Sequence, residues 1–397
     1  MPLKARASKQ SMGRINRIWI LLLFAALLAG CSGGKNLHFT QEGAEVSPKP
    51  KVKSGKFLET DWSYKTGDGF SAERNVLSPA ITGDRVFVAS PDGRVASLQL
   101  DSGEVDWRID LKLDLLAGVG VGQGMAVVVS SEGQAIALKA RDGTELWRTG
   151  VGGEVLARPV VAPGVVVLRV GDSRIVGLNA DTGEVSWNIQ KSVGGLSVRG
   201  VSTPLLNGRG VVAGLADGRL LAADVDKGSI LWETNVGRRR GADRVSQLAD
   251  IDADPVLMGT ILYVASFQSR VVAMALGSPR VIWSSDLSTI RNLGVDENNL
   301  YVVVEGGVPT AVNRFTGDLL WSQSALKGRG LSAALPLQDS VIVGDYEGNV
   351  YRLDAGTGEL TGSQKIGGGA IVAPPLKADG RIVLLSESGR LRVLSTR

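Results

Sequence analysis

The sequence predicts an all-β protein, an eight-bladed β-propeller of four-stranded repeats whose ring is closed by an N-terminal strand. Three observations predict this fold. A segment of constant length recurs and ends in tryptophan, each copy contains two turn signals, and the C-terminal copy lacks a strand that is found near the N-terminus. Repeats of about 40 residues with this pattern are typical of propeller blades.

The N-terminus has the pattern of a secretory signal. Residues 1–17 carry five basic side chains and no acid, and the apolar run "IWILLLFAALL" follows at 18–28. Its eleven residues are too few to cross a bilayer but suit a signal peptide, so we expect residues 1–30 to be removed. Removal changes the formal net charge from +4 to −1. The main argument for a nucleic-acid partner is lost with it, and we predict none.

The only cysteine, Cys31, lies in "LLAGCSGG". This stretch resembles the lipobox of bacterial lipoproteins, and the resemblance implies cleavage before Cys31 and acylation of both its sulfur and its amine. Several acyl chains on one residue give stable anchoring. By the same resemblance, Ser32 in place of aspartate implies transport to the outer membrane, with the folded part in the periplasm. A cysteine that lies beside a signal peptide by chance is the alternative.

Residues 31–56 form a polar segment with four glycines, two prolines and scattered lysines. This composition predicts a flexible tether between the lipid anchor and the folded part. Its lysines could contact anionic lipid, but a solvated linker is the simpler interpretation. The predicted organisation is therefore a signal peptide at 1–30, a lipidated tether at 31–56 and a propeller at 57–397.

Seven segments of equal length recur in the predicted propeller. They span residues 90–107, 130–147, 170–187, 215–232, 266–283, 304–321 and 345–362. Six end in tryptophan, and the seventh ends in Gly362 instead. Each contains a two-residue turn such as Asp92-Gly93, a strand of alternating apolar residues, a second turn and a final strand. An apolar run before the first turn supplies another strand.

A shorter strand that contains a proline completes each unit. Pro79, Pro159, Pro204 and Pro255 each lie 28 residues before a tryptophan. Proline cannot donate a hydrogen bond to a sheet, so we expect this strand at one edge and the tryptophan strand at or near the other.

The eighth unit is split between the two ends of the chain. The C-terminal stretch "VAPPLKADGRIVLLSESGRLRVLSTR" supplies three strands, and "FLETDWSYK" at 57–65 supplies the fourth with Trp62. Joining the ends leaves no open edge in the ring.

Eight tryptophans occur, of which Trp19 lies in the signal and seven belong to the repeats. We assign these seven to packing between neighbouring blades, with each indole against small residues such as Ala180. Stacking on a ligand is the alternative.

The predicted propeller is poor in catalytic side chains. The only histidine, His38, lies in the tether, so residues 57–397 contain neither histidine nor cysteine. This composition excludes histidine-dependent triads, zinc sites of histidine or cysteine, and haem ligation by histidine or cysteine from the propeller. We predict no enzyme activity, no catalytic residue, no cofactor and no metal site. The repeat also resembles that of the pyrroloquinoline-quinone (PQQ) dehydrogenases, but the adjacent cysteines of those enzymes are absent.

The repeat period is broken at two neighbouring connections. Trp232 and Trp283 are 51 residues apart, against 40 for Trp147 and Trp187, and the excess lies in 236–255. The connection 191–204 is also long. Both join an outer strand to the inner strand of the next blade, so we expect them side by side on one face. Exposed aliphatic residues beside opposite charges there suit a protein interface. The run Arg238-Arg239-Arg240 is most simply a solvated loop.

The mature chain as a whole resembles the BamB family, the propeller lipoproteins of the β-barrel assembly machine with PQQ-like repeats. The most specific stretches are "GLSVRG" at 195–200 and "QLADIDADPVL" at 247–257. The resemblance implies a non-enzymatic scaffold that binds the POTRA region of BamA and aids the insertion of unfolded outer-membrane proteins. The implied contacts are Leu196, Val198, Arg199, Asp250 and Asp252. The family pattern has leucine at Val198 and lacks the arginine run. A lipoprotein that binds glycan or peptidoglycan and a PQQ-dependent dehydrogenase are the alternatives.

Overall fold

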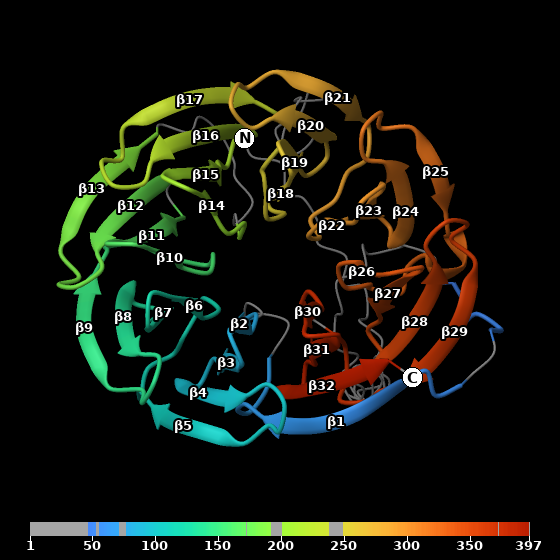
Figure 1. The fold of residues 1–397 in the computed structure, drawn as a ribbon, viewed down its shortest axis with the longest axis horizontal. Coiled ribbons are helices and arrows are strands. Elements are labelled where there is room, and N and C mark those ends of the chain that lie inside the picture. The colour runs from blue at the N-terminus through green and yellow to red at the C-terminus, as the bar shows by residue number, and fades with distance from the viewer. Residues whose placement is uncertain are drawn as a thin grey trace, which may run out of the picture. The chain divides into compact units, whose positions relative to one another are not determined.

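The computed structural model describes residues 47–52, 55–70, 77–171, 173–191, 201–237, 249–371 and 373–396. The chain divides into two compact units, Met1–Leu37 and His38–Arg397, and all described residues belong to the second. They form eight four-stranded sheets and one short 3-10 helix, η1 (Ser324–Leu326). The sheets stand in a ring as the blades of a propeller, as the sequence predicts (Figure 1). Within the described ranges, no helix is long and apolar enough to span a membrane.

The first four blades follow one another along the chain. Blade 1 contains β2 (Ala80–Thr82), β3 (Arg85–Ala89), β4 (Arg94–Gln99) and β5 (Val105–Asp110). Blade 2 contains β6 (Gly120–Gly122), β7 (Met125–Val129), β8 (Gln134–Lys139) and β9 (Glu145–Gly150). Blade 3 contains β10 (Val160–Ala162), β11 (Val165–Val170), β12 (Arg174–Asn179) and β13 (Val185–Gln190). Blade 4 contains β14 (Leu205–Asn207), β15 (Gly210–Gly214), β16 (Arg219–Asp224) and β17 (Ile230–Asn235).

The remaining blades complete the ring. Blade 5 contains β18 (Val256–Met258), β19 (Ile261–Ala265), β20 (Val271–Ala275) and β21 (Val281–Ser285). Blade 6 contains β22 (Gly294–Val295), β23 (Asn299–Val304), β24 (Val308–Asn313) and β25 (Leu319–Ser322). Blade 7 contains β26 (Leu335–Leu337), β27 (Ser340–Gly344), β28 (Asn349–Asp354) and β29 (Leu360–Lys365). Blade 8 contains β30 (Leu376–Ala378), β31 (Arg381–Leu385), β32 (Arg390–Thr396) and β1 (Leu58–Lys65).

In blades 1–7 the strands pair in chain order, from a short inner strand to an outer strand that faces away from the ring axis (Figure 1). The tryptophan strand is the outer edge, as predicted. The prolines differ slightly from expectation, because Pro79, Pro159, Pro204 and Pro255 each stand one residue before the inner strand. A proline there leaves the hydrogen bonds of the strand intact.

The ring closes through the two ends of the chain, as the sequence predicts. In blade 8, β1 lies beside β32 in an antiparallel pair that runs from Leu58 opposite Thr396 to Lys65 opposite Arg390 (Figure 1). Gln364 of blade 7 bonds to β1 and to the residue before it. Its Oε1 accepts from the amides of Phe57 and Leu58 at 2.9 Å, and its Nε2 donates to the Leu58 carbonyl at 2.8 Å.

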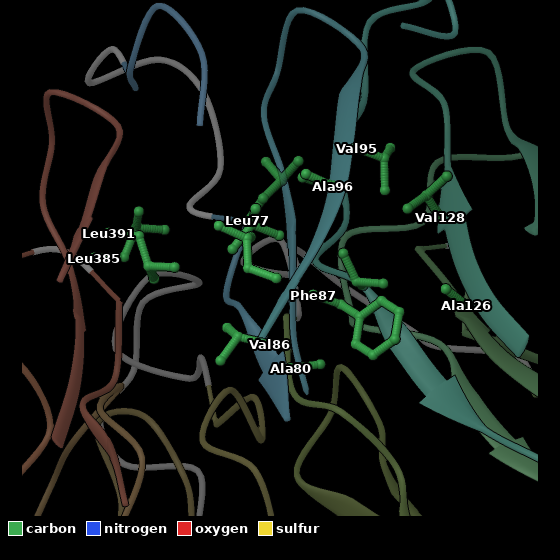
Figure 2. Close-up of a cluster of buried hydrophobic side chains, with 14 of the residues drawn as sticks. Leu77, Ala80, Val86, Phe87, Val95, Ala96, Ala126, Val128, Leu385 and Leu391 are labelled. Carbon is green, nitrogen blue, oxygen red and sulfur yellow. The ribbon is translucent and has the colours of Figure 1, made fainter. Parts of the chain in front are cut away.

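The core lies between the blades. Figure 2 shows one cluster, in which Val86 and Phe87 of blade 1 lie among Val128 of blade 2 and Leu391 of blade 8. The two middle strands of each blade carry apolar side chains on both faces because each face packs on a neighbouring blade. Full burial of one such aliphatic side chain contributes roughly 1.5–3 kcal/mol.

Six tryptophans make the same contact with the next blade. Their indole Nε1 atoms donate to a main-chain carbonyl of the following blade at 2.7–2.9 Å; the donors are Trp62, Trp107, Trp147, Trp187, Trp283 and Trp321. Trp147, for example, donates to Ala180 and lies over Gly183, where a Cβ would come within 2.6 Å of the ring. Gly183 also has a φ of +75°, so the turn needs glycine for two reasons.

Two of the eight junctions lack this contact. Trp232 of blade 4 is only half-buried and donates no hydrogen bond from its indole within the described chain. The turn that it faces in blade 5 reads "LGSP", and Gly277 there has neither a positive φ nor a neighbour at its Cβ position. Between blades 7 and 8, Gly362 replaces the tryptophan, and its Cβ position lies 3.3 Å from the ring of Phe57.

The segment before β1 contacts blade 7, although the sequence predicts a flexible tether as far as residue 56. The amide of Ser47 donates to the Lys327 carbonyl at 3.0 Å, and Lys49 Nζ donates to Asn349 Oδ1 at 3.1 Å. Ser47, ten residues before the predicted boundary at residue 57, therefore already contacts the propeller.

Comparison of two tryptophans tests the importance of the contact between blades. We expect Trp147→Ala to lower the free energy of unfolding by about 3–5 kcal/mol, because it leaves a cavity and removes the bond to Ala180. Trp232→Ala should cost clearly less, since that indole is half-buried and donates no hydrogen bond to a described residue. Urea unfolding of both variants measures the difference. Equal losses would show that the indole contact is not what joins the blades.

Candidate functional site

The two long connections emerge on one face of the propeller, here called the connection face. It consists of the connections between blades together with the turns between the second and third strands. The start of the 236–255 connection is bonded to such a turn, because the amides of Val236 and Gly237 donate to the Gly218 carbonyl at 2.9 and 3.0 Å. Arg270 of the equivalent turn in blade 5 donates from Nε to the Val236 carbonyl at 2.7 Å.

The predicted site residues fall into two groups. Leu196, Val198 and Arg199 lie outside the described residues, as do Cys31 and the run Arg238–Arg240. Asp250 and Asp252 are described, and their exposed fractions are 0% and 4%. Both side chains are therefore buried, so the role predicted for them as contacts with a partner stays a prediction that surface exposure does not support.

Arg169 lies close enough to both carboxylates for their charges to act on it. It lies in β11, on the same face of blade 3 as Val165 and Val167, and is 5% exposed. Its Nη1 donates to Ser202 Oγ at 2.6 Å and to the Ile251 carbonyl at 3.2 Å. Ser202 Oγ in turn donates to the Ile251 carbonyl at 2.9 Å. One arginine thus bonds to the 191–204 connection and to the 236–255 connection.

A second set of bonds extends this link to the next blade. The amide of Thr203 donates to Asp254 Oδ1 at 2.6 Å. Asp254 and Asn292 bond to each other twice, through the Asp254 amide to Asn292 Oδ1 at 2.9 Å and through Asn292 Nδ2 to Asp254 Oδ2 at 3.0 Å. Three successive connections are therefore joined by hydrogen bonds. Arg169, Ser202, Asp250, Asp252 and Asp254 are here called the Arg169 cluster.

The charges of the cluster are strongly desolvated. Burial lowers the pKa of Arg169, and the charges of Asp252, Asp250 and Asp254 oppose this effect. Burial raises the pKa of Asp252 to about 6, and the nearby Arg169 charge offsets only part of that effect. Both carboxylate oxygens of Asp252 are buried, and a hydrogen bond from the main chain of Val201 lowers its pKa only in part. Buried groups of this kind are costly, so the cluster must be maintained by the packing around it.

Sequence reasoning missed Arg169, Ser202 and Asp254. A signal for Arg169 was present, because alignment of the repeats on tryptophan places it where Val129 and Ala265 stand in other blades. A single arginine in an otherwise apolar inner position indicates a buried partner of opposite charge. The chemistry of the cluster is structural. Within the described ranges, no three histidine, cysteine or acidic residues are grouped so that they could hold a metal ion.

The raised pKa of Asp252 predicts how its effect on stability depends on pH. Its ordinary value is 3.8, so the folded state binds the proton more tightly than the unfolded state. The folded state therefore gains stability as the pH falls through the folded pKa of about 6 toward the unfolded value. The Asp252→Asn variant cannot take up this proton, so its stability does not gain from the fall in pH. The charges of Asp250 and Asp254 still act on Arg169 in the variant.

We expect Asp252→Asn to be more stable than the wild type above about pH 6.5, by on the order of 2–3 kcal/mol, and equally stable below about pH 4. Urea unfolding of both proteins across this pH range measures the difference. A difference that does not change with pH would contradict the assignment.

Known proteins match this chain over nearly its whole length. The family model described as "Outer membrane protein assembly factor BamB" matches residues 54–114, 92–309 and 304–397. The protein of that name from Pseudomonas aeruginosa is 41% identical over 371 residues, which cover 94% of this chain and 96% of that protein. The one from Kangiella koreensis is 39% identical over 383 residues, which cover 96% of this chain and 97% of that protein.

Solved structures show the same relationship. The crystal structure of BamB from Moraxella catarrhalis matches with a TM-score of 0.78 and 27% identity, over 85% of this chain and 99% of that one. Quinohemoprotein alcohol dehydrogenase from Comamonas testosteroni matches with a TM-score of 0.68 and 14% identity, over 85% of this chain and 76% of that one. The second likeness concerns the fold alone. The family match over the propeller and the relatives aligned over nearly their full length show that this chain belongs to the BamB family of outer membrane protein assembly factors.

Proposed function

We propose that this chain is a non-enzymatic scaffold lipoprotein of the outer-membrane β-barrel assembly complex. Cys31 anchors it to the periplasmic side of the outer membrane, and its connection face binds the POTRA region of BamA. Membership of the BamB family supports the role in assembly, and the relatives are named as assembly factors rather than as enzymes. The observation that carries the choice of face is the set of hydrogen bonds from Arg169 to both long connections.

The residues predicted to contact BamA have two different roles in this proposal. Leu196, Val198 and Arg199 make the direct contacts with the partner in this proposal. Asp250 and Asp252 act from below, since their side chains are buried beside Arg169. A loop that is already held in its binding conformation loses less entropy on association, and affinity rises accordingly.

In this proposal the lipid anchor and the rigid ring both favour binding to the partner. Anchoring confines the propeller to the membrane surface and raises its effective concentration near the partner. The ring then presents the connection face without internal rearrangement. Unfolded outer-membrane proteins are the clients of the complex in this proposal.

Charge reversal at one surface position tests the proposed partner contact. We expect Arg199→Glu to weaken binding to the POTRA region of BamA about tenfold or more, because a hot-spot cation becomes a repelling anion. Binding is measured by co-purification and by titration with the isolated POTRA region. The control is Arg209→Glu, at a position whose side chain is 74% exposed and paired only with Asp226 among the described residues. Equal binding of the wild type and Arg199→Glu would contradict the assigned contact.

Replacement of the predicted acylation site tests the anchor. We expect Cys31→Ala to move the protein from the outer-membrane fraction to the soluble periplasmic fraction, because no acyl chain remains to hold it. Cell fractionation with an antibody against the propeller measures the distribution. Ser32→Ala is the control, since it keeps the thiol. Retention of Cys31→Ala in the outer membrane after a salt wash would contradict lipid anchoring.

A further inference from the structure

A cavity of about 310 Å³ lies on the connection face where blades 5, 6 and 7 meet. Its walls come from the turn that follows β19, the turn that follows β23, and the connections on either side of blade 6 (Figure 1). Apolar side chains line most of it, among them Phe267, Ile290, Val303, Val304 and Leu331. None of the residues predicted to contact BamA lies in its walls. It is here called the Arg291 pocket, after the one basic residue that lines it.

Arg291 makes the pocket chemically unusual. Its main-chain amide donates to Thr289 Oγ1 at 2.9 Å, but no described carboxylate pairs with its guanidinium. Burial lowers the pKa of Arg291, and no neighbouring charge counters that effect. Buried or half-buried arginines are normally paired, because an unpaired guanidinium that is partly removed from water is costly. An anion bound beside it would remove this cost.

The rim of the pocket offers further donors. Gly306, Gly330 and Leu331 line the pocket, and their main-chain amides donate to no acceptor in the described part of the chain. Gly306 and Gly330 have φ values of +87° and +55°, so these turns depend on glycine. The one acidic lining residue, Glu305, is exposed and already interacts with another group. The pocket thus combines an apolar cavity with a guanidinium and unpaired amides.

We propose that the Arg291 pocket binds the carboxyl-terminal residue of a polypeptide, with an apolar side chain in the cavity and the carboxylate against Arg291. Capture of a terminal carboxylate by backbone amides and a cation is a recurring mode of peptide recognition. The volume lies at the lower end of the range for ligand pockets, which suits one side chain better than a lipid acyl chain. The proposal rests on the proposed function, in which the clients are polypeptides, and gives their ends a separate site on the same face.

A thermodynamic cycle tests the pairing of the carboxylate with Arg291. The probe is a six-residue peptide ending in leucine, with a fluorophore at its N-terminus, prepared as the free acid and as the C-terminal amide. The protein is the mature chain with Cys31→Ala, so that no detergent is needed. We expect the wild-type pocket to bind the acid about tenfold more tightly than the amide, as measured by fluorescence anisotropy. With Arg291→Met, acid and amide should bind equally.

Control variants separate a local effect from general damage. Arg209→Met removes an exposed arginine elsewhere and should keep the tenfold preference for the acid. Ile290→Glu places an anion at the rim, where the side chain is 42% exposed, and should weaken binding of the acid more than binding of the amide. Thermal unfolding of each variant checks that the fold is kept.

Each outcome decides the proposal. Equal binding of acid and amide by the wild type, or no binding of either, overturns it. Displacement of the peptide by monomeric decanoate at lower concentrations than by an unlabelled peptide acid would identify a fatty-acid site and also overturn it. Binding to the POTRA region is measured separately with the same variants. Arg291→Met should keep that binding, so failure of the pocket and failure of the scaffold proposal can be told apart.

Discussion

The contact between an indole of one blade and a glycine turn of the next is the interaction on which the rest of the structure depends. A single four-stranded blade has two apolar faces and cannot bury either of them by itself. The indole fixes the distance and angle at which the next blade packs, because its ring fills the space that a glycine leaves and its nitrogen bonds to a carbonyl of the same turn. Repeated around the ring, this contact leaves the connections between blades free to vary without loss of the fold.

The two junctions that lack the contact are stabilised in other ways. Between blades 7 and 8, Phe57 packs against Gly362 and Gln364 bonds to β1, so the closing strand is held by side chains of the preceding blade. Between blades 4 and 5, the long connection crosses the junction, and the buried charges of the Arg169 cluster hold it at one end while Arg270 holds it at the other. The ring is thus least regular where the candidate partner surface lies. A surface that evolves for a partner is constrained by that partner as well as by packing, and departures from the repeat are expected there.

Burial of charge on the connection face has a cost that packing must offset. An arginine and three aspartates removed from water are unfavourable unless they are mutually arranged, and Asp252 reports the remaining imbalance through its raised pKa. On the same face, burial lowers the pKa of Arg291, and no described carboxylate pairs with its guanidinium. The first set contains charges of both signs and holds chain segments together. The second is uncompensated and faces a cavity, which is the physical basis for assigning it a ligand.

The sequence by itself determined the architecture, because strand periodicity, paired turn residues and the spacing of tryptophans are local signals that hold for each repeat. It also determined the ring closure through Trp62, and the absence of histidine and cysteine from the propeller. Only the tertiary structure decided which charges are buried. Asp250 and Asp252 lie in a long connection between blades, yet their side chains are buried near Arg169, which lies more than eighty residues earlier in the chain. The "LGSP" turn differs from the glycine turns on which the other indoles pack. This difference predicts the missing contact of Trp232 only when it is known that Trp232 faces this turn. Contacts between distant residues depend on how blades pack, and no local pattern encodes them.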